Sequence, residues 1–407
     1  MPRFWFWVRL LGLAALVYTL RWLIFDTKRV DKYGGFPRYM REDHHRFDQF
    51  CLSKTKDDTF VEIESNRRQI DKPEARHIVF LKVHKAASST VQNIFLRFGA
   101  IRDLVFMLPK SNSNVISLTN SVSEQNVLRS PTGKVYDILC CHVIYNKSAM
   151  QTFMPKDTVY VGIVRHPFEQ FLSTINYFRP VEFFNIAGPH KAKTFLRNPT
   201  KYVSRAGIGN FLDNRMAYEF NFPRTLFIDR TEDEIQTYLR KLDQEFTIVL
   251  VADYLDESII LMRRLLGWKL KDILHGRVNT GKRRSAKVPK METITKELHK
   301  HWAELDYALY DYFSKRLFDR IKLEGPGFQS ELLYFKRVQR DVQSFCFNTY
   351  IYNINVRESI AINKSPWNER FEITSLDCIY MNINENIFIQ EVRHRQYLRQ
   401  SLTNSTV

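Results

Sequence analysis

The chain has 407 residues, of which 44% are hydrophobic and 14% aromatic, so it can bury a large core and wholesale disorder is excluded. This length is enough for one large domain or two ordinary ones. The formal net charge of +17 suits an anionic partner such as nucleic acid, a membrane surface or a highly charged small molecule. A generally basic surface without a specific partner is the alternative.

The N-terminal segment 4–25 is apolar and aromatic, although Arg9 and Arg21 interrupt it. It is long enough to span a bilayer, and both arginines lie toward its ends, where long side chains reach the interface. We predict a cytoplasmic tip and signal-anchor helix over residues 1–25, with a cleaved signal peptide or an interfacial helix as alternatives. The charged, aperiodic residues 26–74 predict a stem.

A buried strand followed by a helix is predicted next. Residues 78–83 form a β-branched and aromatic run, and the apolar spacing that follows predicts a helix ended by Gly99. Between them, the loop 84–90 reads His-Lys-Ala-Ala-Ser-Ser-Thr. A cation and three hydroxyls at a helix N-terminus favour an anion site, although the Walker glycines are missing. An ordinary Ser/Thr cap with Lys85 in solvent is the alternative.

Strands and helices alternate further along the chain. Strands are predicted over residues 135–140, 158–164 and 246–251 from their β-branched and apolar content. Pro167 suits the first turn of the helix that follows the second of these strands. With the strand at 78–83, this alternation predicts an α/β fold with a mostly parallel sheet and helices on both faces. Such sheets bind ligands at the carboxyl ends of their strands.

Three further stretches complete the predicted organisation. Residues 103–134 are rich in Ser and Asn and predict an irregular excursion. Asp256 and Gly267 are expected to cap the two ends of one helix, and apolar spacing predicts one long amphipathic helix over 298–317. The pattern then weakens, and we predict an irregular C-terminal extension over residues 331–407 that packs on the main domain.

Polar side chains follow three of the predicted strands at the point where each strand ends. His84 and Lys85 follow the first, His142 the second and Arg165 the third. Ser173 comes eight residues after Arg165, so a planar guanidinium and a hydroxyl could hold a second phosphate. Two such anion-binding sites favour a nucleotide with phosphates at both ends of its ribose. An arginine–carboxylate pair with a solvent-exposed serine is the alternative.

Cysteines and glycosylation sequons bear on the compartment. The chain has five cysteines and no CxxC pair with zinc spacing. Cys346 and Cys378 could form a disulfide or remain buried free thiols. Sequons at Asn146, Asn363 and Asn404 give mild support to a lumenal domain.

Segments 80–94 and 165–173 resemble the galactose 3-O-sulfotransferase family, whose members are Golgi membrane enzymes. The resemblance continues through His142, Asn214, residues 254–268, Asn279 and the helix that carries Trp302, Leu305 and Asp306. It implies a P-loop-like sulfotransferase fold with the catalytic domain over residues 75–330. It also implies a single-pass type II anchor with this domain in the Golgi lumen.

The resemblance implies 3′-phosphoadenosine-5′-phosphosulfate as the sulfuryl donor. Lys85 with Ser88, Ser89 and Thr90 would hold its 5′-phosphosulfate, and no metal is required by the motifs. Its 3′-phosphate would lie at Arg165 and Ser173, while Asn279 and Arg283 would close over the nucleotide.

For transfer to a galactose hydroxyl, Lys85 would stabilise the leaving phosphate. His84 and His142 are the candidate bases, with a slight preference for His142, and Glu257 is a weaker candidate. The chain departs from the usual family residues at Ala86, Cys141 and His166.

The sequence therefore predicts a Golgi sulfotransferase that acts on galactose, at the 3-position, in glycolipid or glycoprotein glycans. Alternatives are a sulfotransferase for another glycan, such as a glycosaminoglycan, or a catalytically weakened relative that binds glycan or nucleotide. A P-loop kinase is disfavoured, because Arg165 ends the strand where such a kinase needs an aspartate for magnesium. Binding to nucleic acid is not predicted, since the basic residues are dispersed and no recognised module is present.

Overall fold

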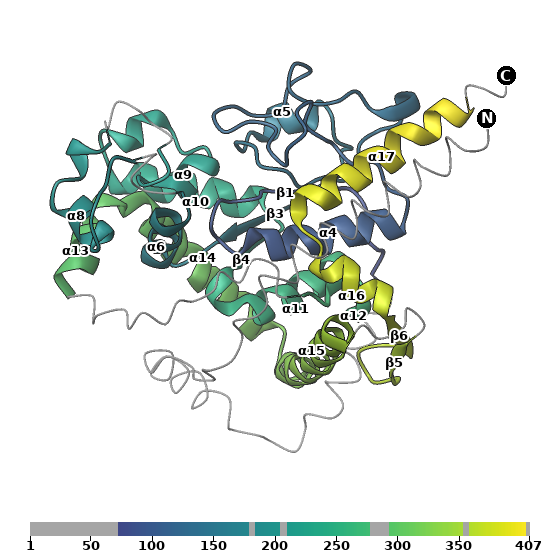
Figure 1. Cartoon of the computed structure of the whole chain (residues 1–407). Coiled ribbons are helices and arrows are strands. Elements are labelled where there is room, and N and C mark those ends of the chain that lie inside the picture. The colour runs from purple at the N-terminus through teal and green to yellow at the C-terminus, as the bar shows by residue number, and fades with distance from the viewer. Residues whose placement is uncertain (1–71, 179–183, 204–209, 277–292, 353–357, 404–407) are drawn as a thin grey trace. The chain divides into compact units, whose positions relative to one another are not determined.

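The computed structural model describes residues 72–178, 184–203, 210–276, 293–352 and 358–403 (Figure 1). The predicted anchor, nearly all of the predicted stem, and Asn279, Arg283 and Asn404 lie outside these ranges. Within them, no helix combines the length and the apolar character that a membrane span requires.

A parallel sheet of four strands lies at the centre of the described fold, in the order β2-β1-β3-β4. The strands are β1 (Ile78–Phe80), β2 (Ile138–Leu139), β3 (Val159–Val164) and β4 (Ile248–Val251). Every strand residue except Val159 is buried, which explains why the sequence shows continuous apolar runs instead of alternation. The predicted α/β class with a parallel sheet is confirmed, but β1 and β2 are shorter than the apolar runs that contain them.

Three helices follow strands as the alternation predicts: α4 (Ser88–Ile101), α6 (Pro167–Tyr177) and α11 (Leu255–Leu266). Pro167 occupies the first turn of α6 and Gly267 ends α11 with φ 66°, as predicted. The expected cap at Asp256 is wrong, because α11 begins one residue earlier and Tyr254 is its N-cap.

The predicted end of α4 at Gly99 is also wrong, since the helix continues to Ile101. Gly99 serves packing instead. A Cβ at this position would lie 2.4 Å from Cζ of Phe106 and 2.6 Å from Cδ1 of Ile138. The glycine therefore lets α4 lie against the chain segment that leads to β2.

The long helix predicted over 298–317 is two helices, α13 (Thr293–Trp302) and α14 (Glu304–Leu323), which meet at Ala303. Both α11 and α14 pack against β4. Five further helices belong to this part of the chain: α5 (Lys147–Gln151), α8 (Lys191–Arg197), α9 (Arg215–Glu219), α10 (Glu232–Glu245) and α12 (Leu270–Ile273).

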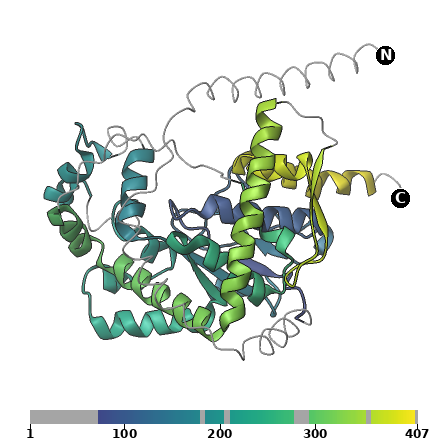
Figure 2. The same cartoon turned by 90° about the horizontal axis from the view of Figure 1, so that it is seen from below.

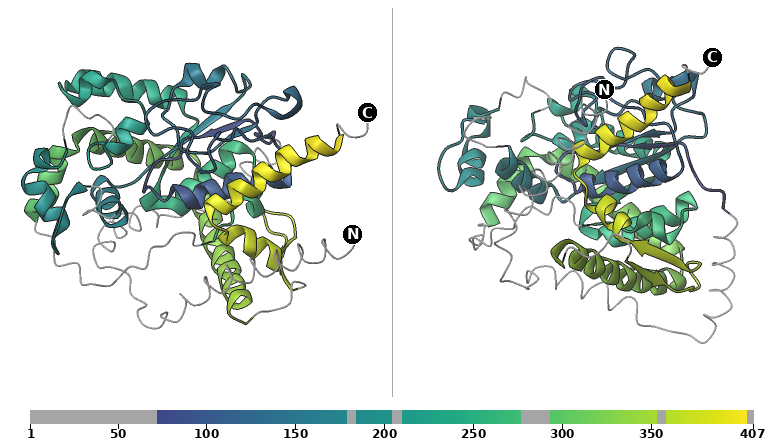
Figure 3. Two further views of the ribbon diagram at one scale, coloured as in Figure 1. Left: turned by 45° about the horizontal axis from the view of Figure 1, so that its top comes forward. Right: turned by 45° about the vertical axis from the view of Figure 1, so that its right-hand side comes forward.

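The predicted irregular extension over residues 331–407 is wrong. The structure has α15 (Pro326–Tyr352), a hairpin of β5 (Ser359–Ile362) and β6 (Phe371–Thr374), α16 (Ser375–Asn382) and α17 (Glu385–Thr403). Helix α15 lies across the fold when it is seen from below (Figure 2), and α17 runs beside α4 (Figure 3). The buried face of α15 repeats at helical spacing, through Phe328, Leu332, Phe335, Val338 and Val342.

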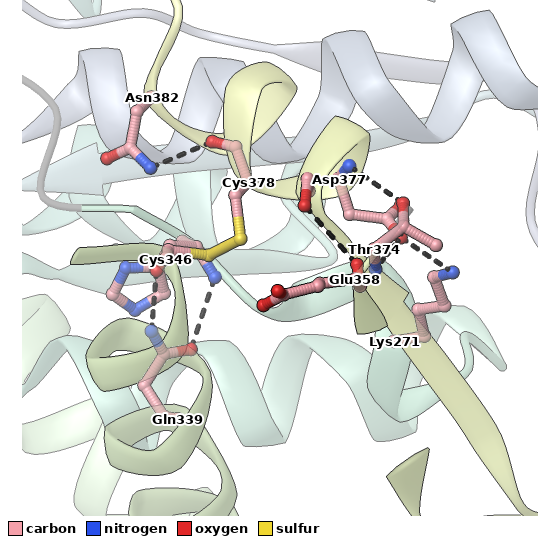
Figure 4. Close-up of a disulfide and its surroundings, with 10 residues drawn as sticks. Lys271, Gln339, Cys346, Glu358, Thr374, Asp377, Cys378 and Asn382 are labelled. Carbon is pink, nitrogen blue, oxygen red and sulfur yellow. Dashed lines mark hydrogen bonds and ion pairs between the residues drawn. A yellow bond between two sulfur atoms is a disulfide. The ribbon is translucent and has the colours of Figure 1, made fainter. Parts of the chain in front are cut away.

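A disulfide between Cys346 and Cys378 joins α15 to α16, which decides between the two alternatives that the sequence left open (Figure 4). Next to it, Thr374 and Asp377 form a reciprocal capping box that begins α16. Lys271 of α12 contacts the same Asp377 carboxylate at 3.2 Å. The C-terminal elements are therefore attached to the sheet domain by both covalent and polar contacts.

Candidate functional site

The carboxyl ends of β1, β2 and β3 bring the predicted polar residues together. The rings of His84 and His142 stack with their centroids 3.6 Å apart and their planes 18° from parallel. Arg165 donates a hydrogen bond from Nη1 to the carbonyl oxygen of Lys85 at 3.0 Å. The predicted meeting of these four residues at one edge of the sheet is therefore observed.

The loop between β1 and α4 turns sharply at two left-handed residues. Lys85 has φ 60° and Ala87 has φ 58°, a conformation that favours glycine. Ala87 is the N-cap of α4, and its side chain makes no capping hydrogen bond. The ordinary Ser/Thr cap is thus not what the structure shows. The hydroxyl of Ser88 instead donates to the carbonyl oxygen of Val83 at 2.5 Å.

Lys85 and Arg165 give this loop a high density of positive charge. Nζ of Lys85 lies 3.5 Å from the centroid of the Tyr177 ring, and the side chain is half-buried. Burial, assisted by the charge of Arg165, lowers the pKa of Lys85 to about 8. Nη2 of Arg165 also lies 3.6 Å from Oε2 of Glu169. Ser173, the other residue predicted to hold the 3′-phosphate, is half-buried on α6.

The hydrogen bonds of the two histidines determine their tautomers. Nδ1 of His142 lies 2.8 Å from the carbonyl oxygen of Lys82, which can only accept, so Nδ1 carries the proton. Nδ1 of His84 bonds to a carboxylate oxygen of Glu219, whose other oxygen accepts the backbone N–H of His84 at 2.8 Å. Burial, with the nearby His84 and Lys82, lowers the pKa of His142 well below its ordinary value. A neutral His142 therefore presents Nε2 as a lone pair.

Glu219 is a buried carboxylate that the sequence reasoning missed. Burial would raise its pKa, but Arg215 and His84 outweigh that effect and hold the pKa at about 2. Nη2 of Arg215 lies 2.9 Å from Oε1 of Glu219, one helical turn away on α9. An ionised Glu219 can only accept, so Nδ1 of His84 also carries a proton.

The ligand atoms of His84, His142 and Glu219 all lie within 4.8 Å of one another, as in a metal site. Arg215 shares the Glu219 carboxylate, and Lys82 adds a second positive charge close to His142. These cations oppose a metal ion, so the cluster fits a hydrogen-bonded network for proton transfer better than a metal centre.

A reciprocal pair of hydrogen bonds holds α9, which carries Arg215 and Glu219. Asp306 of α14 accepts the backbone N–H of Ala217 at 2.7 Å, while Asn214 accepts the backbone N–H of Asp306 at 3.1 Å. Burial raises the pKa of Asp306 to about 7, against the effect of the N–H donors. Asn214 and Asp306 are both part of the sequence resemblance. Their hydrogen bonds hold α9 in place and so position Arg215 and Glu219 beside the histidines.

A second ion pair lies beside the loop. The ammonium of Lys82 is 1% exposed and lies 2.7 Å from both Oε1 of Gln92 and Oε2 of Glu385, the first residue of α17. The same carboxylate oxygen accepts the hydroxyl of Ser89. Two hydroxyls predicted to hold the donor, those of Ser88 and Ser89, therefore make internal hydrogen bonds in this structure.

The remaining weaker candidate, Glu257, pairs through its carboxylate with Lys336 of α15 at 2.8 Å, a partner outside the histidine cluster. Sequence signals existed for some of the missed residues. Arg215 and Glu219 are opposite charges four residues apart, and Lys82 interrupts an otherwise apolar run. No local signal connects Glu385 to a loop nearly 300 residues earlier.

Comparison with known proteins gives this geometry a context. Residues 9–370 match the sequence pattern of the family described as galactose-3-O-sulfotransferase. The matched range includes the histidine cluster, Lys85 and Arg165, and it ends before α16 and α17.

Individual relatives are similar over more than half of the chain. Galactose-3-O-sulfotransferase 2 of mouse (Mus musculus) is 27% identical over 354 residues, which cover 81% of this chain and 86% of the relative. The human (Homo sapiens) protein of the same name is 30% identical over 282 residues, covering 68% and 70%. Human galactosylceramide sulfotransferase is 28% identical over 253 residues, covering 61% and 59%.

Proposed function

The chain belongs to the galactose-3-O-sulfotransferase family, and from that premise we propose that it transfers a sulfuryl group from 3′-phosphoadenosine-5′-phosphosulfate to galactose. The proposed acceptor atom is the 3-hydroxyl of galactose in glycolipid or glycoprotein glycans. The relatives are named for galactose and for galactosylceramide, which supports this class of acceptor.

The contact between Lys85 and Arg165 is the observation that carries the proposal. It joins the loop after β1 to the end of β3, so that two cations adjoin at one edge of the sheet. A donor with about four negative charges suits this edge, because both ends of the nucleotide carry anionic groups. The left-handed turns at Lys85 and Ala87 direct the loop around the N-terminus of α4, where backbone N–H groups add to the attraction.

The residues of the chain divide the chemistry of transfer between them. The bond between sulfur and the galactose oxygen forms as the bond between sulfur and the leaving phosphate oxygen breaks. Lys85, protonated below its pKa of about 8, stabilises the charge that develops on that phosphate. Nε2 of His84 or of His142 takes the proton from the galactose hydroxyl, since both histidines hold their first proton at Nδ1.

The test is transfer of labelled sulfate from the donor to a panel of glycans that end in β-galactose, with the product linkage determined. We expect labelling at the 3-position for the wild type and loss of transfer for Lys85→Ala. Lys315→Ala is the matched control, because that lysine is 78% exposed on α14 and pairs with Asp319. A folded wild type that labels no galactoside would refute the proposal, and labelling of a glycosaminoglycan alone would replace the acceptor.

We further propose that the enzyme is a single-pass type II protein of the Golgi membrane, with residues 1–25 as anchor and the catalytic domain lumenal. The disulfide between Cys346 and Cys378 supports an oxidising compartment. Asn146 and Asn363 are exposed, so both sequons are accessible to glycosylation.

Glycosidase treatment of the protein made in cultured cells tests this topology. We expect a mobility shift that Asn146→Gln and Asn363→Gln together reduce. A protein without any N-glycan, located in the cytosol, would contradict the lumenal placement.

A further inference from the structure

We propose that Glu219 is a positioning residue that makes His84, and not His142, the proton acceptor in sulfuryl transfer. This inference rests on the proposed function, and it selects between two histidines that the sequence could not separate. Each of the two stacked rings holds a proton at Nδ1 and keeps Nε2 for the substrate.

The two rings differ in which one can hold a second proton. His84 lies against a carboxylate whose two oxygens bond its ring and its own backbone N–H. The ring contact of His142 is with a neutral carbonyl oxygen, and the charges that act on it come from His84, Lys82 and Arg215, all of which oppose a further positive charge. Burial of both rings makes this difference large, because a buried charge without a counter-charge is costly.

The groups around His84 fix the orientation of its imidazole ring as well as favour its positive charge. Its backbone oxygen accepts the amide of Gln170 from α6 at 3.1 Å, and the edge of its ring meets Phe211 with centroids 5.0 Å apart. Stacking on His142 covers one face of the ring. The groups around His84 are thus Glu219 and Arg215 on α9, Gln170 on α6, and His142 and Lys82 at the sheet edge.

Glu219 can act in this way because contacts within α9 and from α14 hold its carboxylate in place. Arg215 binds its carboxylate from within the same helix, and Asp306 of α14 caps the first turn of that helix. During transfer the galactose hydroxyl proton moves to Nε2 of His84 as the oxygen bonds to sulfur. The electron pair of the breaking bond leaves with the donor phosphate, and Glu219 stays ionised beside the imidazolium.

The variant Glu219→Gln tests the proposal because it keeps the shape of the side chain and removes its charge. We expect kcat to fall by about 10²- to 10⁴-fold, the range that applies to general-base catalysis and its orienting carboxylates. Affinity for the 3′,5′-bisphosphate nucleotide, measured by calorimetry, should change less than about threefold, because the donor contacts lie on other residues. The acid limb of the kcat profile should move to lower pH, since the imidazolium loses its counter-charge.

His142→Gln is the matched comparison, because glutamine can still donate to the carbonyl oxygen of Lys82. We expect a smaller loss of kcat than for Glu219→Gln and an acid limb that stays in place. The proposal is overturned if Glu219→Gln keeps the wild-type rate and pH profile, or if His142→Gln moves the acid limb and Glu219→Gln does not.

A spectroscopic readout separates this inference from the proposed function. A ring N–H that donates to a carboxylate gives a downfield proton resonance, which should disappear in Glu219→Gln and persist in His142→Gln. Persistence of that resonance in Glu219→Gln would refute the pairing itself. If the wild type shows the resonance and binds the nucleotide but sulfates no glycan, the proposed function and the acceptor role fail while the Glu219–His84 pair stands.

Discussion

The charge of Lys85, and with it the stabilisation of the leaving phosphate, is expected to depend on pH. Burial and Arg165 lower its pKa to about 8, so the ammonium form is lost as pH rises through that value. We expect kcat/KM for the donor to fall above pH 8 in the wild type, because a neutral amine cannot stabilise the leaving phosphate. The measurement is a pH profile of initial rates between pH 6 and pH 10.

Lys85→Arg is the informative comparison for this profile. The variant should transfer sulfate more slowly, because a guanidinium does not fit the place of an ammonium. Its residual activity should nevertheless show no decline near pH 8, since arginine stays protonated there. A wild-type profile that stays flat to pH 10 would contradict the assigned role.

Ala87 has a left-handed backbone conformation that glycine adopts more easily, so a substitution there is expected to raise the stability of the protein. Its φ of 58° is left-handed and its side chain is exposed, so Ala87→Gly removes strain and loses little packing. We expect stabilisation of about 0.5–1 kcal/mol after the greater entropy of the unfolded glycine chain is subtracted. The measurement is the midpoint of denaturant unfolding.

Ala86→Gly provides the control, because Ala86 is buried and is not among the left-handed residues. That change should destabilise the protein by about 1 kcal/mol through lost burial and added chain entropy. Equal effects of the two substitutions would show that strain at Ala87 is not the cause.

Among the elements, α17 contacts the loop from the far end of the sequence. Its first residue, Glu385, contacts Lys82 and Ser89 and also raises the pKa of Lys85, against the larger effects of burial and Arg165. A carboxylate in this place repels an anionic donor and engages a hydroxyl that the donor would use. We therefore expect Glu385→Gln to bind the 3′,5′-bisphosphate nucleotide about fivefold more tightly, which corresponds to about 1 kcal/mol.

Calorimetric titration measures this affinity, and Glu391→Gln on the same helix is the control. Glu391 pairs with Arg395 and Tyr380, outside the loop, so its substitution should leave nucleotide affinity unchanged. Weaker binding by Glu385→Gln would instead mean that this carboxylate holds the loop in its binding conformation.

The sequence predicted most of what depends on local pattern and less of what depends on distant contacts. Apolar runs such as residues 159–164 predict the buried strands of the sheet. The positions of His84, His142 and Arg165 at strand ends predict that they are neighbours. Glu219 and Glu385 reach the site only through tertiary packing, which no local periodicity reports. The helix at 326–352 was missed although its buried positions are periodic, because the asparagine-rich residues after it gave the region an irregular character.

At the scale of the whole molecule, the disulfide attaches the C-terminal elements to α15 across 32 residues of sequence. Closing a loop of that length lowers the entropy of the unfolded chain and stabilises the fold by about 3–4 kcal/mol. We expect the double variant Cys346→Ser, Cys378→Ser to lose about this much free energy of unfolding, measured with urea under non-reducing conditions.

Reductant offers an internal check on this prediction. It should destabilise the wild type and leave the double variant unchanged, because Cys140 and Cys141, the other cysteines among the described residues, are free thiols. A wild type whose bond is chemically reduced but whose unfolding midpoint does not move would contradict the stabilising role.

The end of the family match at residue 370 is a poor place to truncate this protein for expression. A chain that stops there lacks Cys378, the disulfide partner of Cys346, and lacks Glu385, the carboxylate partner of the buried Lys82 ammonium. Such a fragment would retain every motif by which the family is recognised, yet its donor loop would be altered. Shortened versions should therefore extend through α17, and tags are better placed beyond residue 403 than within the segment that leads to it.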